Sequence, residues 1–161
     1  MTEGQSSGKA AFPGAELPMD NSERPREGVV VVVIRGGRLL MARRAPGVLA
    51  GGTWCFVGGA IEPGESQPHA VVREFREEVA GRVRPIRKIW EYTRRDGKLR
   101  LHWWLAELDA DELRPDPAEV SEVRWCTPAD IEALAEVLES NVAFLHEVGC
   151  RLIDRGRPSR D

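Results

Sequence analysis

Three glutamates stand close together in a segment whose pattern predicts a helix over residues 70–79: Glu74, Glu77 and Glu78. At about 100° per residue, the three carboxylates fall within roughly one quarter-turn of the helix surface. Apolar residues of the same segment point the other way: Val72, Phe75 and Val79. We therefore expect a helix that docks by its apolar stripe and presents three carboxylates on another face.

Like charges at this spacing repel each other by a few tenths of a kcal/mol per pair, so the cluster costs stability unless a cation offsets it. Two interpretations are open. The cluster could be a solvated acidic face, with Arg73 and Arg76 as partial counter-charges. It could equally bind Mg²⁺, which takes hard oxygen ligands and completes its shell with water and substrate phosphates.

Residues upstream stand at set distances from the glutamates. Gly59 is followed six residues later by Glu65, and the run Arg73-Glu74-Phe75-Arg76-Glu77-Glu78 begins eight residues after Glu65. Together these positions resemble the signature of the Nudix hydrolase family. The signature fixes seven positions over about twenty residues, which makes the resemblance specific.

Two positions depart from the family pattern. Ala80 stands where the family has a glycine, and Gly81 follows one residue later, where we expect it to end the helix as a left-handed cap. The segment Phe56-Val57-Gly58-Gly59 replaces the family's Phe-Pro-Gly-Gly. Neither change removes a carboxylate, so they affect the expected loop geometry and not the expected metal site.

Nudix enzymes are described as cutting a nucleoside diphosphate linked to another group, by attack of water at phosphorus. The resemblance implies Mg²⁺ (or Mn²⁺) held by four ligands: Glu74, Glu77, Glu78 and the carbonyl of Gly58. Arg73 would orient a neighbouring carboxylate through a charge-assisted hydrogen bond. Gly59 and Glu65 would support the site, Glu65 by bracing it or by binding the metal through water.

Three residues outside the signature are further candidates. Arg44 ends a predicted strand, at a place where nucleotide-binding Nudix enzymes often keep an arginine; the alternative is a polar strand end. Glu119 lies six residues before Trp125, a separation at which a glutamate reaches the metal site in the branch that acts on oxidised nucleotides; the alternatives are that Glu119 is an exposed loop acid or that the nearby Glu122 takes this place. Asn141 matches the asparagine that reads the guanine edge in the MutT-type branch, and it is also a good helix N-cap.

Composition limits the function classes. The net charge of −3 gives no overall basic field, so we expect no nucleic-acid polymer as a partner. The three cysteines are odd in number and lack zinc-site spacing, which indicates reduced thiols. No stretch is long and apolar enough to span a membrane. We expect a soluble, cytoplasmic protein that binds a small nucleotide; its oligomeric state stays open.

The remaining patterns predict strands, turns and helices in one domain. Strands are expected at 29–34, 38–44, 54–56, 84–93, 99–108 and 120–125, the first of them buried on both faces. Gly36-Gly37 and Asp96-Gly97 are expected to join two pairs of these strands as hairpins. Helices are expected at 70–79, after the N-cap Thr127 with Asp130 in its first turn, and from Asn141, the last with Val142, Leu145, Val148 and Leu152 on its apolar side. We expect a domain over residues 28–154 between flexible tails at 1–27 and 155–161. This order is typical of an α/β sandwich, and the resemblance adds a mixed β-sheet between helices.

For the substrate, the runs around the signature look most like the MutT-type branch. We therefore expect a nucleoside triphosphate pyrophosphohydrolase that releases a monophosphate and pyrophosphate. An ADP-ribose or nucleotide-sugar pyrophosphatase is the alternative within the family. A non-catalytic nucleotide sensor is the alternative of another class, and sensors commonly lose the carboxylates that this chain keeps.

Overall fold

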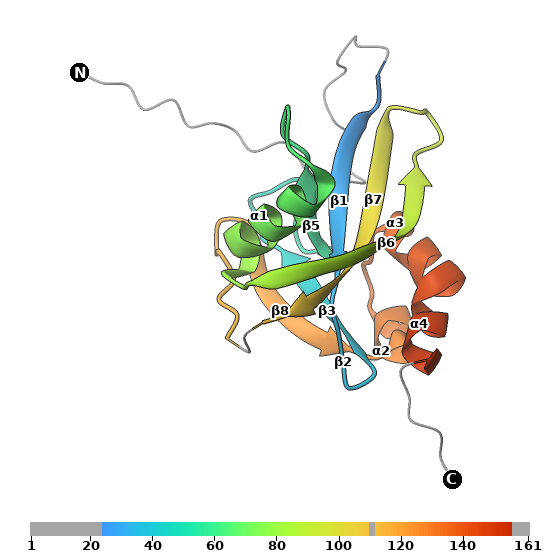
Figure 1. Cartoon of the computed structure of the whole chain (residues 1–161). Helices are drawn as coiled ribbons and strands as arrows, with labels where there is room; N and C mark the ends of the chain where they lie inside the picture. The colour runs from blue at the N-terminus through green and yellow to red at the C-terminus, as the bar shows by residue number, and fades with distance from the viewer. Residues whose placement is uncertain (1–23, 110–111, 156–161) are drawn as a thin grey trace, which may run out of the picture.

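The computed structural model describes residues 24–109 and 112–155, and Figure 1 shows its strands between α1 on one side and α2, α3 and α4 on the other. The strands are β1 (Arg26–Val32), β2 (Ile34–Arg35), β3 (Arg38–Arg44), β4 (Trp54–Cys55), β5 (Val57–Ala60), β6 (Val83–Thr93), β7 (Leu99–Leu108) and β8 (Val120–Cys126). The helices are α1 (Gln67–Val79), α2 (Pro128–Ala133), α3 (Glu139–Phe144) and α4 (Cys150–Arg155), with a π-helical turn at Leu145–Gly149.

The strands form two sheets. One sheet has the order β5-β1-β7-β6 and is mixed, because β1 and β7 are parallel and its other pairs are antiparallel. The other joins β2, β3 and β4, and β8 pairs antiparallel with β3. The expected α/β sandwich with a mixed sheet is confirmed.

The β1 segment runs through the centre because both of its faces are apolar. All five valines from Val29 to Val33 are buried. Val30 and Val32 belong to the core that includes Phe144 of α3, and the intervening valines belong to the core under α1. A strand buried on both faces reads as a continuous run of β-branched residues, as predicted. The strand begins at Arg26, two residues before the expected domain boundary at 28.

Tight turns set the register of the two predicted hairpins. Gly36 and Gly37, with φ of 57° and 74°, connect β2 to β3. Gly97, with φ of 70°, lies in the turn between β6 and β7. Left-handed backbone at consecutive turn residues matches the twist of paired strands, and glycine adopts it without strain. Both hairpins therefore form where the sequence predicts them.

Helix α1 begins with Ser66, whose hydroxyl accepts a hydrogen bond from the backbone N–H of His69 at 3.3 Å. The end of the helix differs from expectation. Ala80, and not Gly81, is the left-handed cap, with φ of 54°. Gly81 is needed for space, because a Cβ there would lie 2.3 Å from Cε1 of Phe75.

The C-terminal part is more broken than its periodicity predicts. Thr127 and Asp130 form a capping box for α2, as expected. The next helix is capped by Leu138, so Asn141 lies inside its first turn and does not cap it. The π-helical turn then shifts the register, and the buried residues are Phe144, Leu145, Gly149 and Ile153. Of the four expected apolar positions, only Leu145 is fully buried.

No helix among the described residues combines the length and apolar character needed to cross a membrane. The expected tails lie almost entirely outside the described residues.

Candidate active site

The guanidinium of Arg73 is the centre of the site. Its Nε and Nη2 donate to the two carboxylate oxygens of Glu65, each at 2.7 Å. Its Nη1 donates to Glu74 at 2.8 Å and to Glu77 at 3.4 Å. Its Nη2 also donates to the carbonyl of Ala60 at 2.9 Å, which ties α1 to the end of β5. One cation thus orients three carboxylates.

These contacts change the acidity of both partners. The hydrogen bonds from Arg73 are the main cause that lowers the pKa of Glu65 below its usual value. The same bonds are the main cause that raises the pKa of Arg73 further above its usual range. Bidentate pairing of arginine with a carboxylate gives direction as well as energy. Glu65 is therefore a bracing residue, held charged by the arginine that positions the other acids.

Glu74 lies against the backbone of Gly59. A Cβ at Gly59 would meet the Cδ of Glu74 at 2.4 Å and its two carboxylate oxygens at 2.5 and 2.6 Å. Real Cβ atoms essentially never approach other atoms closer than 3.0 Å. Gly58 is also crowded, because a Cβ there would meet the carbonyl oxygen of Val29 at 2.2 Å. Glycine at position 59 therefore makes room for the carboxylate of Glu74.

The exposure of the three glutamates corrects the expected arrangement of α1. Glu74 and Glu78 are only 2% and 5% exposed and lie on the same side as the buried Phe75 and Val79. Only Glu77 reaches solvent, with its side chain 40% exposed. Val71 is buried in place of Val72. The carboxylates therefore flank the apolar stripe, since α1 rests on the sheet beside the glycine backbone that receives Glu74.

The end of β3 brings a buried cation to the same region. Arg44 is 7% exposed, and its Nε donates to the carbonyl of Leu49 at 2.7 Å, which folds the loop after β3 around it. Burial raises the pKa of the neighbouring Cys55 thiol to about 12, against the lowering effect of Arg44 and with a further rise from Glu78. The charges of Arg44 and Glu78 thus both act on the thiol of Cys55, although the two residues come from different elements.

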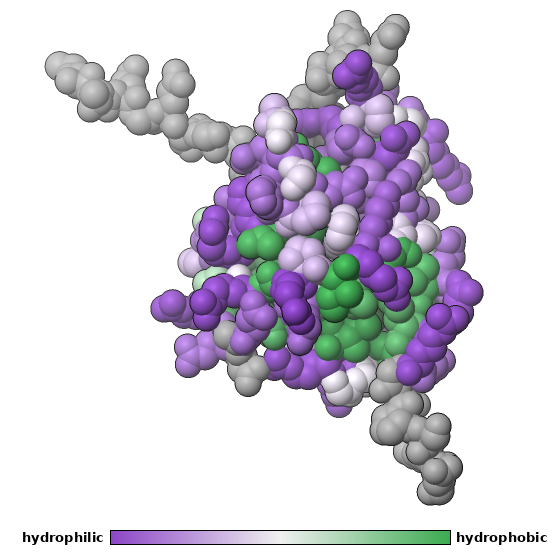
Figure 2. Space-filling view, in the orientation of Figure 1, coloured by the Kyte–Doolittle hydropathy of each residue, from purple (hydrophilic) through white to green (hydrophobic). Residues whose placement is uncertain are grey.

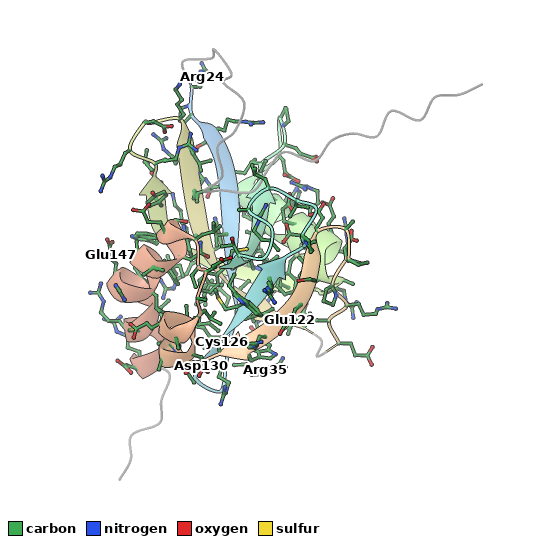
Figure 3. All side chains as sticks on the ribbon, turned by 180° about the vertical axis from the view of Figure 1, so that it is seen from behind. Arg24, Arg35, Glu122, Cys126, Asp130 and Glu147 are labelled. Carbon is green, nitrogen blue, oxygen red and sulfur yellow. The ribbon has the colours of Figure 1, made fainter. Side chains whose placement is uncertain are left out.

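Backbone contacts place Glu119 between these elements. The N–H of Ala45 donates to the carbonyl of Glu119 at 2.9 Å, directly after Arg44. Earlier in the same loop, the N–H of Asp116 donates to the carbonyl of Glu78 at 2.8 Å. The rival acid Glu122 lies on β8, where Figure 3 labels it, and accepts a hydrogen bond from Arg124 at 2.7 Å. Of the two acids, Glu119 comes from the loop that touches the end of α1.

The side chain of Asn141 reaches the strand that leads into the site. Its Oδ1 accepts from the backbone N–H of Phe56 at 2.9 Å, and its Nδ2 donates to Ser140 at 3.2 Å. Nearby, the N–H of Trp54 donates to Glu136 at 2.8 Å, so this segment runs along β4. The alternative that Asn141 is an N-cap is wrong, because Leu138 is the N-cap and Asn141 is the third residue of α3. Its predicted contact with a base stays a prediction.

The donor set suits a hard divalent cation, because carboxylate oxygens are the ligands that Mg²⁺ prefers. In the part of the chain that the structure describes, no three acidic, histidine or cysteine side chains are already gathered as a metal site. Instead, Arg73 draws Glu65, Glu74 and Glu77 toward itself. The assignment of Glu74, Glu77, Glu78 and Gly58 as ligands therefore stays a prediction that the residue types fit.

Sequence reasoning missed two residues at the site and one elsewhere. The carbonyl of Ala60 and the thiol of Cys55 have no sequence signal, because both act through position alone. His102 is 4% exposed, and its Nε2 lies 3.0 Å from Glu27. Its Nδ1 lies 3.5 Å from Glu91. These partners come from neighbouring strands, so no motif could pair them.

Comparison with known proteins agrees with this geometry. The model of the NUDIX domain matches residues 24–148, which include every site residue named above. The chain belongs to the Nudix family. Hydrolases of this family cleave nucleoside diphosphates linked to another group and generally use divalent metal ions.

Relatives of this Nudix hydrolase carry different names. A protein named NAD-capped RNA hydrolase NudC, from Stutzerimonas stutzeri, is 35% identical over 113 residues, which are 66% of this chain and 38% of the relative. The Escherichia coli CTP pyrophosphohydrolase is 45% identical over 53 residues, which are 33% of this chain and 39% of the relative. The chain therefore spans about two fifths of the length of these relatives.

Solved structures show the same fold. A MutT NUDIX hydrolase from Burkholderia pseudomallei has a TM-score of 0.64 at 23% identity and covers 78% of this chain and 99% of that chain. A NUDIX hydrolase from Nitrosomonas europaea has a TM-score of 0.71 at 18% identity, with coverages of 95% and 84%. The E. coli ORF135 protein has a TM-score of 0.63 at 26% identity, with coverages of 85% and 96%.

Proposed function

We propose that this Nudix hydrolase cleaves a nucleoside triphosphate to the monophosphate and pyrophosphate, with Mg²⁺ or Mn²⁺. The observation that carries the proposal is the cluster in which Arg73 orients Glu65, Glu74 and Glu77 beside a glycine backbone. The MutT-like sequence runs and the name of the CTP pyrophosphohydrolase relative support a triphosphate as the substrate.

The candidate metal ligands differ in their exposure to solvent. A divalent ion held by Glu74, Glu77 and Glu78 would neutralise phosphate charge and lower the pKa of a bound water. Glu77 is the candidate ligand open to solvent, from which the nucleotide arrives. Glu74 is held in one orientation by Arg73 at 2.8 Å, so no reorganisation is needed when the substrate binds.

The other candidates would act around this centre. Arg44, buried at the end of β3, would offset the charge of the substrate's phosphates. Glu119 would accept the proton of the attacking water or help to hold the ion. Asn141, tied to Phe56, would lie where the base binds, since an amide offers a donor and an acceptor to a purine edge.

A second candidate substrate is a molecule in which a pyrophosphate joins two nucleosides or joins a nucleoside to a sugar. The names of the NudC relatives favour it, because their substrate is an NAD-type dinucleotide on RNA. The products separate the two candidates. Cleavage of a triphosphate at the α-phosphorus releases pyrophosphate, whereas cleavage of a dinucleotide releases two monophosphates.

The test is a product screen with purified full-length protein and Mg²⁺. Nucleoside triphosphates, their oxidised guanine forms, ADP-ribose, nucleotide sugars and NAD are incubated separately, and products are resolved by chromatography. We expect the highest kcat/KM for a triphosphate, with pyrophosphate as the product. A higher kcat/KM for NAD or ADP-ribose would replace the first candidate by the second.

A further inference from the structure

The loop between β5 and α1 carries a partner of Arg73. It spans residues 61–66, and both carboxylate oxygens of Glu65 accept hydrogen bonds from Arg73 at 2.7 Å. Four residues of the loop are exposed: Glu62, Pro63, Gly64 and Ser66. Figure 1 shows this segment projecting beyond the start of α1, and Figure 2 shows a largely hydrophilic surface around that helix. Burial of apolar side chains therefore does little to hold the loop in place.

The loop's own hydrogen bonds fix its shape. The backbone N–H of Glu62 donates to Oε1 of Glu65 at 3.2 Å, and the N–H of Glu65 donates to the carbonyl of Glu62 at 3.0 Å. Ser66 caps the helix that follows it. Each of these bonds joins the loop to itself or to α1. None of them fixes the loop relative to the sheet.

The loop is anchored to the sheet at its two ends. At its start, the N–H of Ile61 donates to the carbonyl of Glu27 on β1 at 3.0 Å. At its end, the indole Nε1 of Trp104 on β7 donates to the side-chain Oε1 of Gln67, the first residue of α1, at 2.9 Å. In the part of the chain that the structure describes, the bond from Trp104 is the one hydrogen bond that links residues 62–67 to a strand.

Trp104 is well suited to hold this end of the loop. Its strand lies between β1 and β6 and pairs with both. Its ring packs against the core under α1, and an indole loses little conformational freedom because it has only two side-chain torsions. The longer side chain of Gln67 samples several rotamers unless a partner selects one. The indole N–H is therefore a fixed donor for the start of α1.

The position of Gln67 affects the carboxylates through Arg73. Glu65 lies two residues before Gln67, and its two bonds to Arg73 require both of its oxygens to face the guanidinium. The same guanidinium donates to Glu74 at 2.8 Å. A displacement at the start of α1 would therefore turn Arg73, and with it the carboxylate that lies against Gly59.

We propose that Trp104 is a positioning residue for the carboxylate site: its indole N–H holds Gln67 and thereby keeps Glu65 paired with Arg73. It touches neither substrate nor metal. The part of the inference that concerns metal binding rests on the proposed function, because it takes Glu74 as a ligand. The effect on the pair of Glu65 and Arg73 requires no metal and no substrate, so it is measured separately.

The test variant is Trp104→Phe, which keeps an aromatic ring and removes the indole N–H. Trp90→Phe is the matched control, because Nε1 of Trp90 donates to Glu147 at 3.1 Å and its ring packs against the other core, which contains Phe144. Gln67→Leu removes the acceptor of the bond, whereas Gln67→Glu keeps an acceptor. Gln67 is partly exposed, so its variants test the contact without removing a core side chain.

The first measurement is hydrogen exchange of the side-chain Nε–H of Arg73, followed by NMR on isotope-labelled full-length protein in EDTA. Arg73→Lys identifies the signal by its loss. The second measurement is the Kd for Mn²⁺ without nucleotide, followed by electron paramagnetic resonance. Tm is recorded for every variant.

We expect Trp104→Phe and Gln67→Leu each to raise the exchange rate of the Arg73 Nε–H roughly tenfold or more. The Kd for Mn²⁺ should rise about 10-fold to 100-fold, as for other residues that orient metal ligands. Combining the two changes should add nothing further, because either one breaks the same bond. Gln67→Glu should keep the wild-type exchange rate, and Trp90→Phe should keep both values. Tm should fall only slightly in Gln67→Leu, because one hydrogen bond between neutral groups contributes modestly to stability.

A wild-type exchange rate in Trp104→Phe, with only a lower Tm, would overturn the inference and leave Trp104 as a packing residue. Additive effects in the double variant, or an equal rise in Trp90→Phe, would overturn it as well. Should Trp104→Phe fail to fold, Gln67→Leu decides on the same measurements. Absence of Mn²⁺ binding by the wild type would count against the proposed function, whereas the exchange rate would still decide on the role of Trp104.

Discussion

Replacing Gly59 by alanine tests whether the glycine backbone positions the carboxylate of Glu74. The new Cβ would lie 2.4 Å from the Cδ of Glu74 and within 2.6 Å of both its oxygens. Glu74 is only 2% exposed and is held by Arg73 at 2.8 Å, so it has little room to turn away. The carboxylate must therefore move, or the strand that carries Gly59 must move.

The size of the effect follows from the distance. Restoring an ordinary contact of at least 3.4 Å requires a displacement of about 1 Å, and a misplacement of that size costs about 10²-fold in rate. This corresponds to about 2.7 kcal/mol of activation free energy. Overpacking also lowers the free energy of unfolding, by about 1–3 kcal/mol. We expect a large fall in kcat with a modest fall in Tm.

The assay follows product formation at saturating Mg²⁺ and substrate, with Tm measured on the same samples. Gly47→Ala is the matched control, because nothing lies within 4 Å of a Cβ at that position and its backbone is not left-handed. Glu74→Gln keeps the side-chain volume and should lose kcat to a similar degree with less change in Tm. Wild-type kcat in both Gly59→Ala and Glu74→Gln would refute the placement of Glu74 at the reacting centre.

Four further changes test other parts of the site. Glu77→Gln should lower kcat by at least ~10²-fold (about 2.7 kcal/mol) with an unchanged Tm, because the side chain is 40% exposed and like-charge repulsion is removed; near-normal turnover at saturating Mg²⁺ would contradict its role as a ligand. Asn141→Ala leaves the buried N–H of Phe56 without its acceptor and should cost about 1–3 kcal/mol of stability whether or not Asn141 contacts a base. The ratio of kcat/KM for purine and pyrimidine triphosphates is therefore the measurement that tests base reading. An unchanged ratio would contradict it. The pKa of Glu65 in the folded state lies below its ordinary value of about 4.5, so its contribution to stability is present above about pH 4.5 and is lost as the pH falls through the folded-state pKa. Glu65→Gln should therefore flatten the fall of Tm with acid. An identical acid profile in the two proteins would contradict the coupling of Glu65 to Arg73. Burial raises the pKa of Cys55 to about 12, so this thiol should resist alkylation at pH 8 in the native protein and react after unfolding, and mass spectrometry that finds it alkylated in native protein would contradict the buried arrangement.

Local rules were sufficient where neighbouring residues alone decide the conformation. The glycines at 36, 37 and 97 permit left-handed turns, and the apolar runs on either side of them predict the paired strands. Thr127 caps the helix that follows it. These features depend on contacts within a few residues, so periodicity and turn chemistry predict them.

Local rules failed where a distant element supplied the deciding contact. Glycine is the usual left-handed cap, yet Ala80 takes that conformation, and Gly81 follows it where a Cβ would meet Leu113 at 2.7 Å. Asn141 is a favourable N-cap residue, yet its amide accepts a hydrogen bond from Phe56, 85 positions away. At Asn141, the hydrogen bond to another element outweighs a local capping preference of about 1 kcal/mol.

The sequence by itself determined helix α1, its acids and their arginine, because the spacing of residues along one helix places these side chains within reach of each other. Only the tertiary structure decided which acids are buried, since that depends on how α1 rests on the sheet beside Gly59. Only the tertiary structure brings the ends of β3 and α1 to the loop that holds Glu119, because the backbone contacts of Ala45 and Glu78 with that loop form after the chain has folded.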